Sequence, residues 1–129
     1  LGVKVRYLNT WNEKRRKIAD QYNNMLSDLA IDLPKVADFA KHVYYMYTIR
    51  TSRRDALMDY LTAHGIGSQK IYAIPVPMQP CYKDLGYKEA DIPIASHYAN
   101  ELLCLPVFPE LREDEVHIIS NAIHQFFKR

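Results

Sequence analysis

The sequence predicts an α+β domain in which a short, mostly antiparallel sheet is flanked by helices. Three observations support this fold class. Several segments repeat apolar residues at helical spacing, whereas residues 43–50 alternate and are rich in Tyr, Val, Ile and Thr. The segments follow one another as helix, strand, helix, strand, helix, short strand and helix. The length of 129 residues, without a repeat or long linker, fits one domain.

The first predicted helix covers residues 11–29. Thr10 and Glu13 have the spacing of a capping box, in which a hydroxyl and a carboxylate satisfy free backbone donors. Its apolar face comprises Trp11, Ile18, Tyr22, Met25, Leu26 and Leu29. The other face is basic, and we interpret it as solvated because the formal net charge of the chain is only +2.

The middle of the chain predicts a strand, a helix and a second strand. Residues 43–50 form the first strand. The helix after it has Ser52 as its cap and Asp55 as the acid three positions later. Gly65 lies where this helix should end, because glycine adopts the left-handed conformation most readily. Residues 66–72 form the next predicted strand.

The last third of the chain predicts two helices around a short strand at residues 103–106. Asp91 can cap the first helix, with Pro93 in its first turn. The apolar face of that helix comprises Ile94, Tyr98, Ala99 and Leu102. The final helix opens with Glu113, Asp114 and Glu115, which favour the positive end of the helix dipole. Its predicted core face comprises Val116, Ile119, Ala122, Ile123 and Phe126.

Composition excludes several classes of protein. A net charge of +2 is too small to indicate binding to nucleic acid or to an anionic membrane. No apolar run approaches the roughly 20 residues of a membrane span. Cys81 and Cys104 are too few for a disulfide framework or a metal cluster, so we expect reduced thiols in a cytoplasmic protein.

Residues 68–80 are the strongest candidate for a binding loop. They contain Pro75, Pro77 and Pro80, and proline fixes φ and removes a backbone donor. A stiff, partly apolar loop with a few polar side chains suits the wall of a pocket. The chain has no dinucleotide-binding glycine motif, no P-loop and no HExxH zinc motif. No histidine has metal-ligand spacing, so no metal site is assigned.

Six segments, in order, resemble one family. They are residues 8–16 (LNTWNEKRR), 42–50 (HVYYMYTIR), 54–67 (RDALMDYLTAHGIG), 72–82 (YAIPVPMQPCY), 85–95 (LGYKEADIPIA) and 103–111 (LCLPVFPEL). Together they resemble the C-terminal domain of the DegT/DnrJ/StrS family of pyridoxal-phosphate-dependent nucleotide-sugar aminotransferases. The resemblance is collinear over almost the whole chain, and it includes family members that are labelled pleiotropic regulatory proteins.

The resemblance implies the small domain of an aspartate-aminotransferase-type enzyme. Residues 1–30 would form an interdomain helix region, and residues 31–129 would form the C-terminal small domain, together one structural unit of a longer protein. That parent would transfer an amino group from an amino-acid donor to a keto-sugar nucleotide, and would act as a homodimer. Its pyridoxal phosphate (PLP) would be the electron sink of the reaction.

The resemblance also implies that the cofactor chemistry lies elsewhere in the parent. Family members carry the Schiff-base lysine in a larger domain, and neither Lys70 nor Lys83 matches that motif. We therefore assign no catalytic and no cofactor-binding residue, and expect this chain alone to bind no cofactor. Pro77 and Tyr45 stand where the family usually has histidine, and Ala73 where it has proline.

Four residues of this region are candidates for binding the sugar or the nucleotide. They are Ser68, Tyr72, Gln79 and Tyr82, whose hydroxyl and amide groups can form hydrogen bonds. The alternative interpretation is that the two tyrosines pack the loop and Gln79 caps backbone groups. A second function also stays open, because the chain could instead be a non-catalytic regulatory or interaction domain. The missing histidines favour an altered specificity or such a regulatory role.

Overall fold

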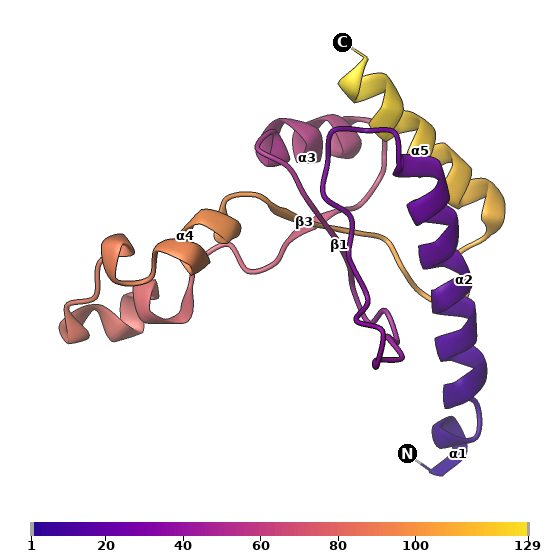
Figure 1. The fold of residues 1–129 in the computed structure, drawn as a ribbon, viewed down its shortest axis with the longest axis horizontal. Helices are drawn as coiled ribbons and strands as arrows, with labels where there is room; N and C mark the ends of the chain where they lie inside the picture. The colour runs from indigo at the N-terminus through magenta and orange to yellow at the C-terminus, as the bar shows by residue number, and fades with distance from the viewer. Residues whose placement is uncertain (1, 129) are drawn as a thin grey trace.

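A computed structural model describes residues 2–128 of the chain. It confirms the predicted α+β class, because helices pack on a small antiparallel sheet (Figure 1). The helices are α1 (Gly2–Val5), α2 (Leu8–Leu26), α3 (Arg54–Ala63), α4 (Pro93–Ala99) and α5 (Glu113–Phe127). The strands are β1 (Tyr47–Arg50), β2 (Gln69–Lys70) and β3 (Leu102–Leu105). Three 3-10 turns lie between β2 and α4, and they are η1 (Val76–Met78), η2 (Pro80–Leu85) and η3 (Glu89–Asp91).

The short strand β3 is the centre of the sheet, whose order is β1-β3-β2 with antiparallel pairs throughout. In the register, Tyr47 faces Leu105 and Ile49 faces Leu103. These four side chains are buried, whereas the residues between them are only partly covered. Because side chains alternate along a strand, one face of the sheet is turned toward the helices.

The hydrophobic core forms between that face and helices α2, α3 and α5 (Figure 1). Its largest fully buried side chains are Tyr22, Leu26, Tyr47, Ile49, Leu57, Leu61, Leu103, Leu105, Val116 and Ile123. The predicted core face of α5 is confirmed, since all five of its residues are buried. The helical spacing of these residues places them on one side of the helix.

The predicted start of the long helix was wrong. Helix α2 begins at Leu8, and the amide of Trp11 already donates to the carbonyl of Tyr7 at 3.0 Å. Thr10 therefore lies inside the helix and caps nothing. The turn of α1 leads directly into α2, because the amide of Tyr7 donates to the backbone carbonyl of Lys4 at 3.0 Å. The helix also ends at Leu26 rather than at residue 29.

The predicted cap at the start of α3 was wrong, whereas the predicted end at Gly65 is confirmed. The helix begins at Arg54, and the hydroxyl of Thr51, not of Ser52, accepts the amide of Arg53 at 3.2 Å. At the other end Gly65 has the predicted left-handed conformation, with φ +72°. Its amide donates to the backbone carbonyl of Thr62 at 3.0 Å. The left-handed residue closes the helix and turns Ile66 back into the core.

Both predicted outer strands are shorter than expected. Residues 43–46 are not part of β1, because Tyr44 has φ +45° and its amide donates to the His42 ring at 3.0 Å. A left-handed residue interrupts the extended backbone. Of residues 66–72, only Gln69–Lys70 pairs with β3.

The predictions around α4 were partly wrong. Pro93 does open the helix, but the Asp91 carboxylate accepts the amide of Lys88 at 2.8 Å and closes η3 instead of capping α4. Of its predicted apolar face, Ile94 and Tyr98 are exposed by 72% and 40%, while Ala99 is buried. The helix thus turns most of its apolar surface away from the core.

Residues 71–99, which we call the arm, leave the body of the domain. In Figure 1 the arm runs from salmon to orange and projects away from α2, α3 and α5. It contains η1, η2, η3 and α4, and it returns to the body where β3 begins. Among the described residues, no helix has both the length and the apolar character needed to cross a bilayer.

Candidate functional site

The proline loop is built from short turns. Pro75 is extended, with φ −56° and ψ 143°, and its carbonyl accepts the amide of Met78 at 2.9 Å. Pro80 opens η2, in which the amide of Tyr82 donates to the backbone carbonyl of Gln79 at 2.9 Å. Pro77 lies inside η1, so the loop is partly 3-10 helix rather than wholly irregular. These local bonds hold the loop in one shape with little help from the core.

Two of the four predicted site residues lie together. Tyr72 and Gln79 line an open hollow of about 510 Å³ at the start of the arm. We call it the arm hollow, and its other lining residues are Ala73, Ile74, Pro80 and Cys81. Tyr72 is 73% exposed, so its hydroxyl is available to a ligand. A phenol, a carboxamide and apolar atoms together suit a sugar ring or a base.

The structure places the other two candidates outside the lining of this hollow. The Ser68 hydroxyl oxygen is buried and has no hydrogen-bond partner among the described residues. Tyr82 lies in η2, beyond Gln79, and is 42% exposed. The hydroxyl groups of Ser68 and Tyr82 are therefore not part of one constellation with Tyr72 and Gln79.

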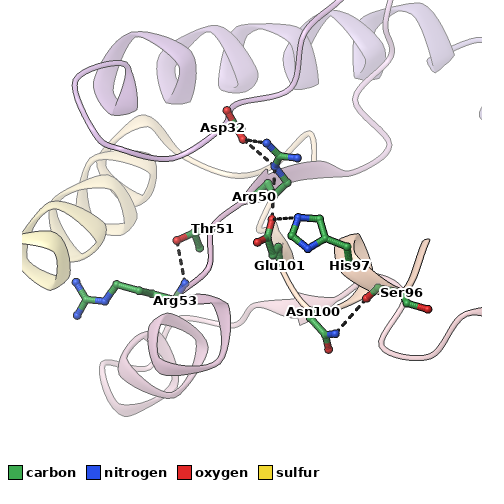
Figure 2. Close-up of polar contacts among 8 residues, drawn as sticks. All are labelled: Asp32, Arg50, Thr51, Arg53, Ser96, His97, Asn100 and Glu101. Atoms are coloured by element: carbon green, nitrogen blue, oxygen red, sulfur yellow. Dashed lines mark hydrogen bonds and ion pairs between the residues drawn. The ribbon is translucent and has the colours of Figure 1, made fainter. Parts of the chain in front are cut away.

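A cluster of polar side chains at the root of the arm was not predicted from the sequence (Figure 2). Arg50, at the end of β1, donates from Nε to Asp32 at 2.7 Å, and its Nη2 also contacts that carboxylate. Glu101 approaches Arg50 at 3.7 Å and the His97 ring at 3.4 Å. The guanidinium also lies 5.0 Å from the centre of the Tyr98 ring. The hydrogen bond to Asp32 raises the pKa of Arg50 above its ordinary value.

The cluster is better suited to holding elements together than to binding an anion. Asp32 and Glu101 face Arg50 and offset its charge. They line a second hollow of about 380 Å³, which also includes Thr51 and Ser52. The register of β1 with β3 puts Arg50 opposite Leu102, and therefore next to Glu101. A separate β-bridge pairs Asp32 with Arg50, so two backbone pairings bring the three charged residues together.

A PLP cofactor does not fit the residues of the arm hollow on their own. The cofactor needs an amine for its Schiff base, a carboxylate for its ring nitrogen and donors for its phosphate. Among the described residues, those that line the arm hollow include neither an amine nor a carboxylate. Lys70 lies just before the arm, but its ammonium is 2.7 Å from the Asp55 carboxylate. Any cofactor would thus need groups from outside this hollow.

Residues 1–124 match the DegT/DnrJ/EryC1/StrS aminotransferase family. The chain is 40% identical, over 99% of its length, to a pleiotropic regulatory protein of Geobacillus stearothermophilus. It is 32% identical, over its full length, to dTDP-3-amino-3,4,6-trideoxy-alpha-D-glucose transaminase of Streptomyces venezuelae. The chain covers only 35% and 34% of these two proteins, respectively.

The fold is similar to part of two solved structures. S. venezuelae DesV, solved in complex with a ketimine intermediate, matches with a TM-score of 0.95 and 31% identity, over 98% of this chain and 34% of that one. An aminotransferase from Brucella abortus matches with a TM-score of 0.88 and 28% identity, over 100% of this chain and 34% of that one. The chain thus spans about a third of the proteins that it matches, both in sequence and in fold. By the match over residues 1–124, the chain belongs to the DegT/DnrJ/EryC1/StrS aminotransferase family.

Proposed function

We propose that this chain is the small domain of a PLP-dependent aminotransferase that transfers an amino group from an amino acid to a keto-sugar nucleotide. The observation that carries the proposal is the TM-score of 0.95 to DesV, whose solved complex contains a ketimine intermediate. Residues 1–30 would form the interdomain helix region and residues 31–129 the C-terminal small domain. Burial of Ile18, Tyr22 and Leu26 in the common core supports one structural unit.

In this proposal the arm hollow forms one wall of the substrate site. The Tyr72 hydroxyl and the Gln79 carboxamide would hydrogen-bond the sugar or the nucleotide, and Ile74 and Pro80 would contact its apolar faces. Ser68 and Tyr82 would contribute only if the loop changes shape on binding. Pro77 lies in η1 and cannot replace the imidazole usual in the family, which favours a shifted sugar specificity.

The cofactor, the dimer and the location of the protein are part of the same proposal. PLP would be bound by the larger part of the enzyme, which would act as a homodimer. A cytoplasmic location is consistent with the free thiols of Cys81 and Cys104.

The test is an assay of the full-length protein that carries this chain. The purified protein is incubated with PLP, an amino-acid donor and a panel of dTDP- and UDP-linked keto sugars. We expect one of these sugars to gain an amino group, detected by mass spectrometry and dependent on the donor. A folded protein that binds PLP but aminates none of the panel would contradict the proposal.

The regulatory alternative rests on the relative from G. stearothermophilus, which is described as a pleiotropic regulatory protein. Under that alternative, the full-length protein would bind a partner without turning over a sugar. The same assay separates the two functions, because only an aminotransferase consumes the donor in proportion to the sugar added.

A further inference from the structure

Both ends of the arm are tied to the first turn of α3. The chain enters the arm after Lys70, the last residue of β2, and leaves it at Ala99, the last residue of α4. The Lys70 ammonium lies 2.7 Å from the Asp55 carboxylate. The Arg54 guanidinium donates to the Ala99 carbonyl at 2.8 Å and contacts the same oxygen of Asp55 as Lys70 does. Two neighbouring residues of α3 thus join the entry of the arm to its exit.

The entry of the arm has fewer supports than the exit. Strand β2 has only two residues that pair with β3. Among residues 2–128, the core cluster and the side chains packed against it include none from the arm. The exit is held by Arg54 and also by Arg50, whose guanidinium lies 5.0 Å from the centre of the Tyr98 ring. In the part of the chain that the structure describes, Lys70 makes the one ion pair that ties the entry to the body.

The entry leads directly into the candidate substrate wall. Lys70 is two residues before Tyr72, which lines the arm hollow. Consecutive Cα atoms are about 3.8 Å apart, so the Cα atoms of these two residues lie within about 8 Å of each other. A shift of the backbone at Lys70 is therefore passed to Tyr72 and, through the turn η1, to Gln79. A displacement of about 1 Å in a group that positions a substrate can lower a reaction rate about 100-fold.

The ion pair between Lys70 and Asp55 contributes little to the stability of the fold. The two side chains are 33% and 64% exposed. Solvent screens such a pair, and holding two flexible side chains in one geometry costs entropy. Hydrogen bonds from Lys70 and Arg54 nevertheless lower the pKa of Asp55, so its carboxylate is charged at neutral pH. A contact that is always charged but stabilises little is suited to fixing the direction of the backbone.

We propose that Lys70 is a positioning residue of the candidate substrate wall. Its ion pair with Asp55 fixes the strand that leads into the arm, and thereby holds Tyr72 and Gln79 where a sugar nucleotide would contact them. The inference rests on the proposed function for the identity of that ligand. Lys70 acts through its charge and not as a nucleophilic amine, because Asp55 engages its ammonium.

The first experiment measures the position of the arm without any substrate. Nitroxide labels are attached to the native Cys81, which lines the arm hollow, and to Ile118→Cys, a position of α5 that is 59% exposed. Cys104→Ala removes the second native thiol. Pulsed electron paramagnetic resonance then gives the distribution of distances between the two labels. We expect Lys70→Met to broaden this distribution about 1.5-fold or more, and Lys70→Arg, which keeps the charge, to restore it.

The matched control is Arg16→Met. This variant also removes a surface ion pair, the one with Glu13 at 3.2 Å, but on α2 of the body. It should leave the distribution of distances unchanged. In urea denaturation, Lys70→Met should lower the free energy of unfolding no more than Arg16→Met does. The proposal is overturned by an unchanged distribution in Lys70→Met, by equal broadening in the control, or by a larger loss of stability in Lys70→Met.

The second experiment measures kinetics in the full-length protein that carries this chain. Lys70→Met should raise the KM for the sugar nucleotide about 3- to 10-fold and leave kcat within about twofold, because a displaced wall weakens substrate and transition state alike. Lys70→Arg should restore the KM. A loss confined to kcat, or no rescue by Lys70→Arg, would overturn the positioning role, because an amine that reacts directly would give that result.

Together the two experiments separate this proposal from the proposed function. A protein that aminates no sugar, with a broadened distribution in Lys70→Met, would refute the function alone and would support the role of Lys70 in holding the arm. An active protein whose KM is unchanged in Lys70→Met would refute the positioning role alone, whether or not the distribution is broadened.

Discussion

The buried guanidinium of Arg54 donates a hydrogen bond of 2.8 Å to the backbone carbonyl of Ala99, which joins the first turn of α3 to the last turn of α4. Arg54 is only 4% exposed, so its charge needs this partner and the neighbouring Asp55 carboxylate. The pair fixes the root of the arm to the body.

Removing the Arg54 guanidinium should destabilise the domain. Arg54→Met keeps most of the apolar stem but leaves the Ala99 carbonyl without its donor. We expect the free energy of unfolding to fall by about 2–4 kcal/mol, measured by urea denaturation. The control is Arg53→Ala, which removes an exposed guanidinium 4.2 Å from the Phe126 ring and should lower it by about 1 kcal/mol or less. An equal loss in the free energy of unfolding for both variants would show that the buried hydrogen bond stabilises the domain no more than the exposed contact does.

Stability should fall in alkaline solution. Burial raises the pKa of both Tyr22 and Tyr47, whose rings lie 4.9 Å apart in the core. A raised pKa means that the unfolded chain loses these protons first, so the free energy of unfolding decreases as pH rises above about 10. Urea denaturation at a series of pH values measures the slope. Tyr47→Phe should flatten it, whereas Tyr72→Phe, at a 73% exposed position, should not.

Two nearby glycines should respond differently to alanine. Gly65 has φ +72°, and a side chain there would meet no atom within 4 Å, so only backbone strain opposes Gly65→Ala. We expect a loss of about 1–2 kcal/mol in the free energy of unfolding. Gly67→Ala has the same open space without the positive φ, and should be neutral or slightly stabilising. A larger loss at position 67 would contradict this account.

The candidate substrate wall predicts a kinetic effect in the full-length protein. Gln79→Ala removes a carboxamide from the arm hollow without touching the core. The KM for the sugar nucleotide should rise about 3- to 10-fold, as expected for one lost hydrogen bond. Gln125→Ala, on α5, should leave KM unchanged. An unaltered KM for Gln79→Ala would favour the interpretation that this side chain only supports the loop.

The isolated chain should not form a specific adduct with PLP. Lys70 is engaged by Asp55 at 2.7 Å, and the arm hollow brings no lysine to a ligand. After borohydride reduction, peptide mapping should find no lysine modified above the level of ordinary surface amines. One lysine labelled to full occupancy would show that the chain holds a cofactor site of its own.

The elements with local signals were predicted well. Helix α5 combines three acids in its first turn with a repeated apolar face, and both signals lie within the helix itself. Gly65 was identified for the same reason, because its conformation depends on its immediate neighbours. Thr10 misled the prediction, since a cap motif means nothing once an earlier turn has already started the helix.

The site depended on contacts that sequence patterns do not contain. Arg50, Asp32 and Glu101 meet only through the pairing of β1 with β3 and the bridge between Asp32 and Arg50. The apolar face of α4 was predicted, but Ile94 and Tyr98 on that face are exposed rather than packed in the core. An apolar stripe indicates a surface that will be covered, and says nothing of which chain covers it.

The packing of α2 against α5 has a consequence for synthesis on the ribosome. The Tyr22 hydroxyl donates to the carbonyl of Pro106 at 3.0 Å, and the His124 ring lies 2.7 Å from the carbonyl of Met25. Helix α2 is translated before Pro106 and α5. It can therefore pack against them only after most of residues 8–127 have been synthesised. Non-local pairing of this kind slows folding and leaves an apolar helix face uncovered in the nascent chain. During that interval the residues of α2 that the folded domain buries are exposed to solvent.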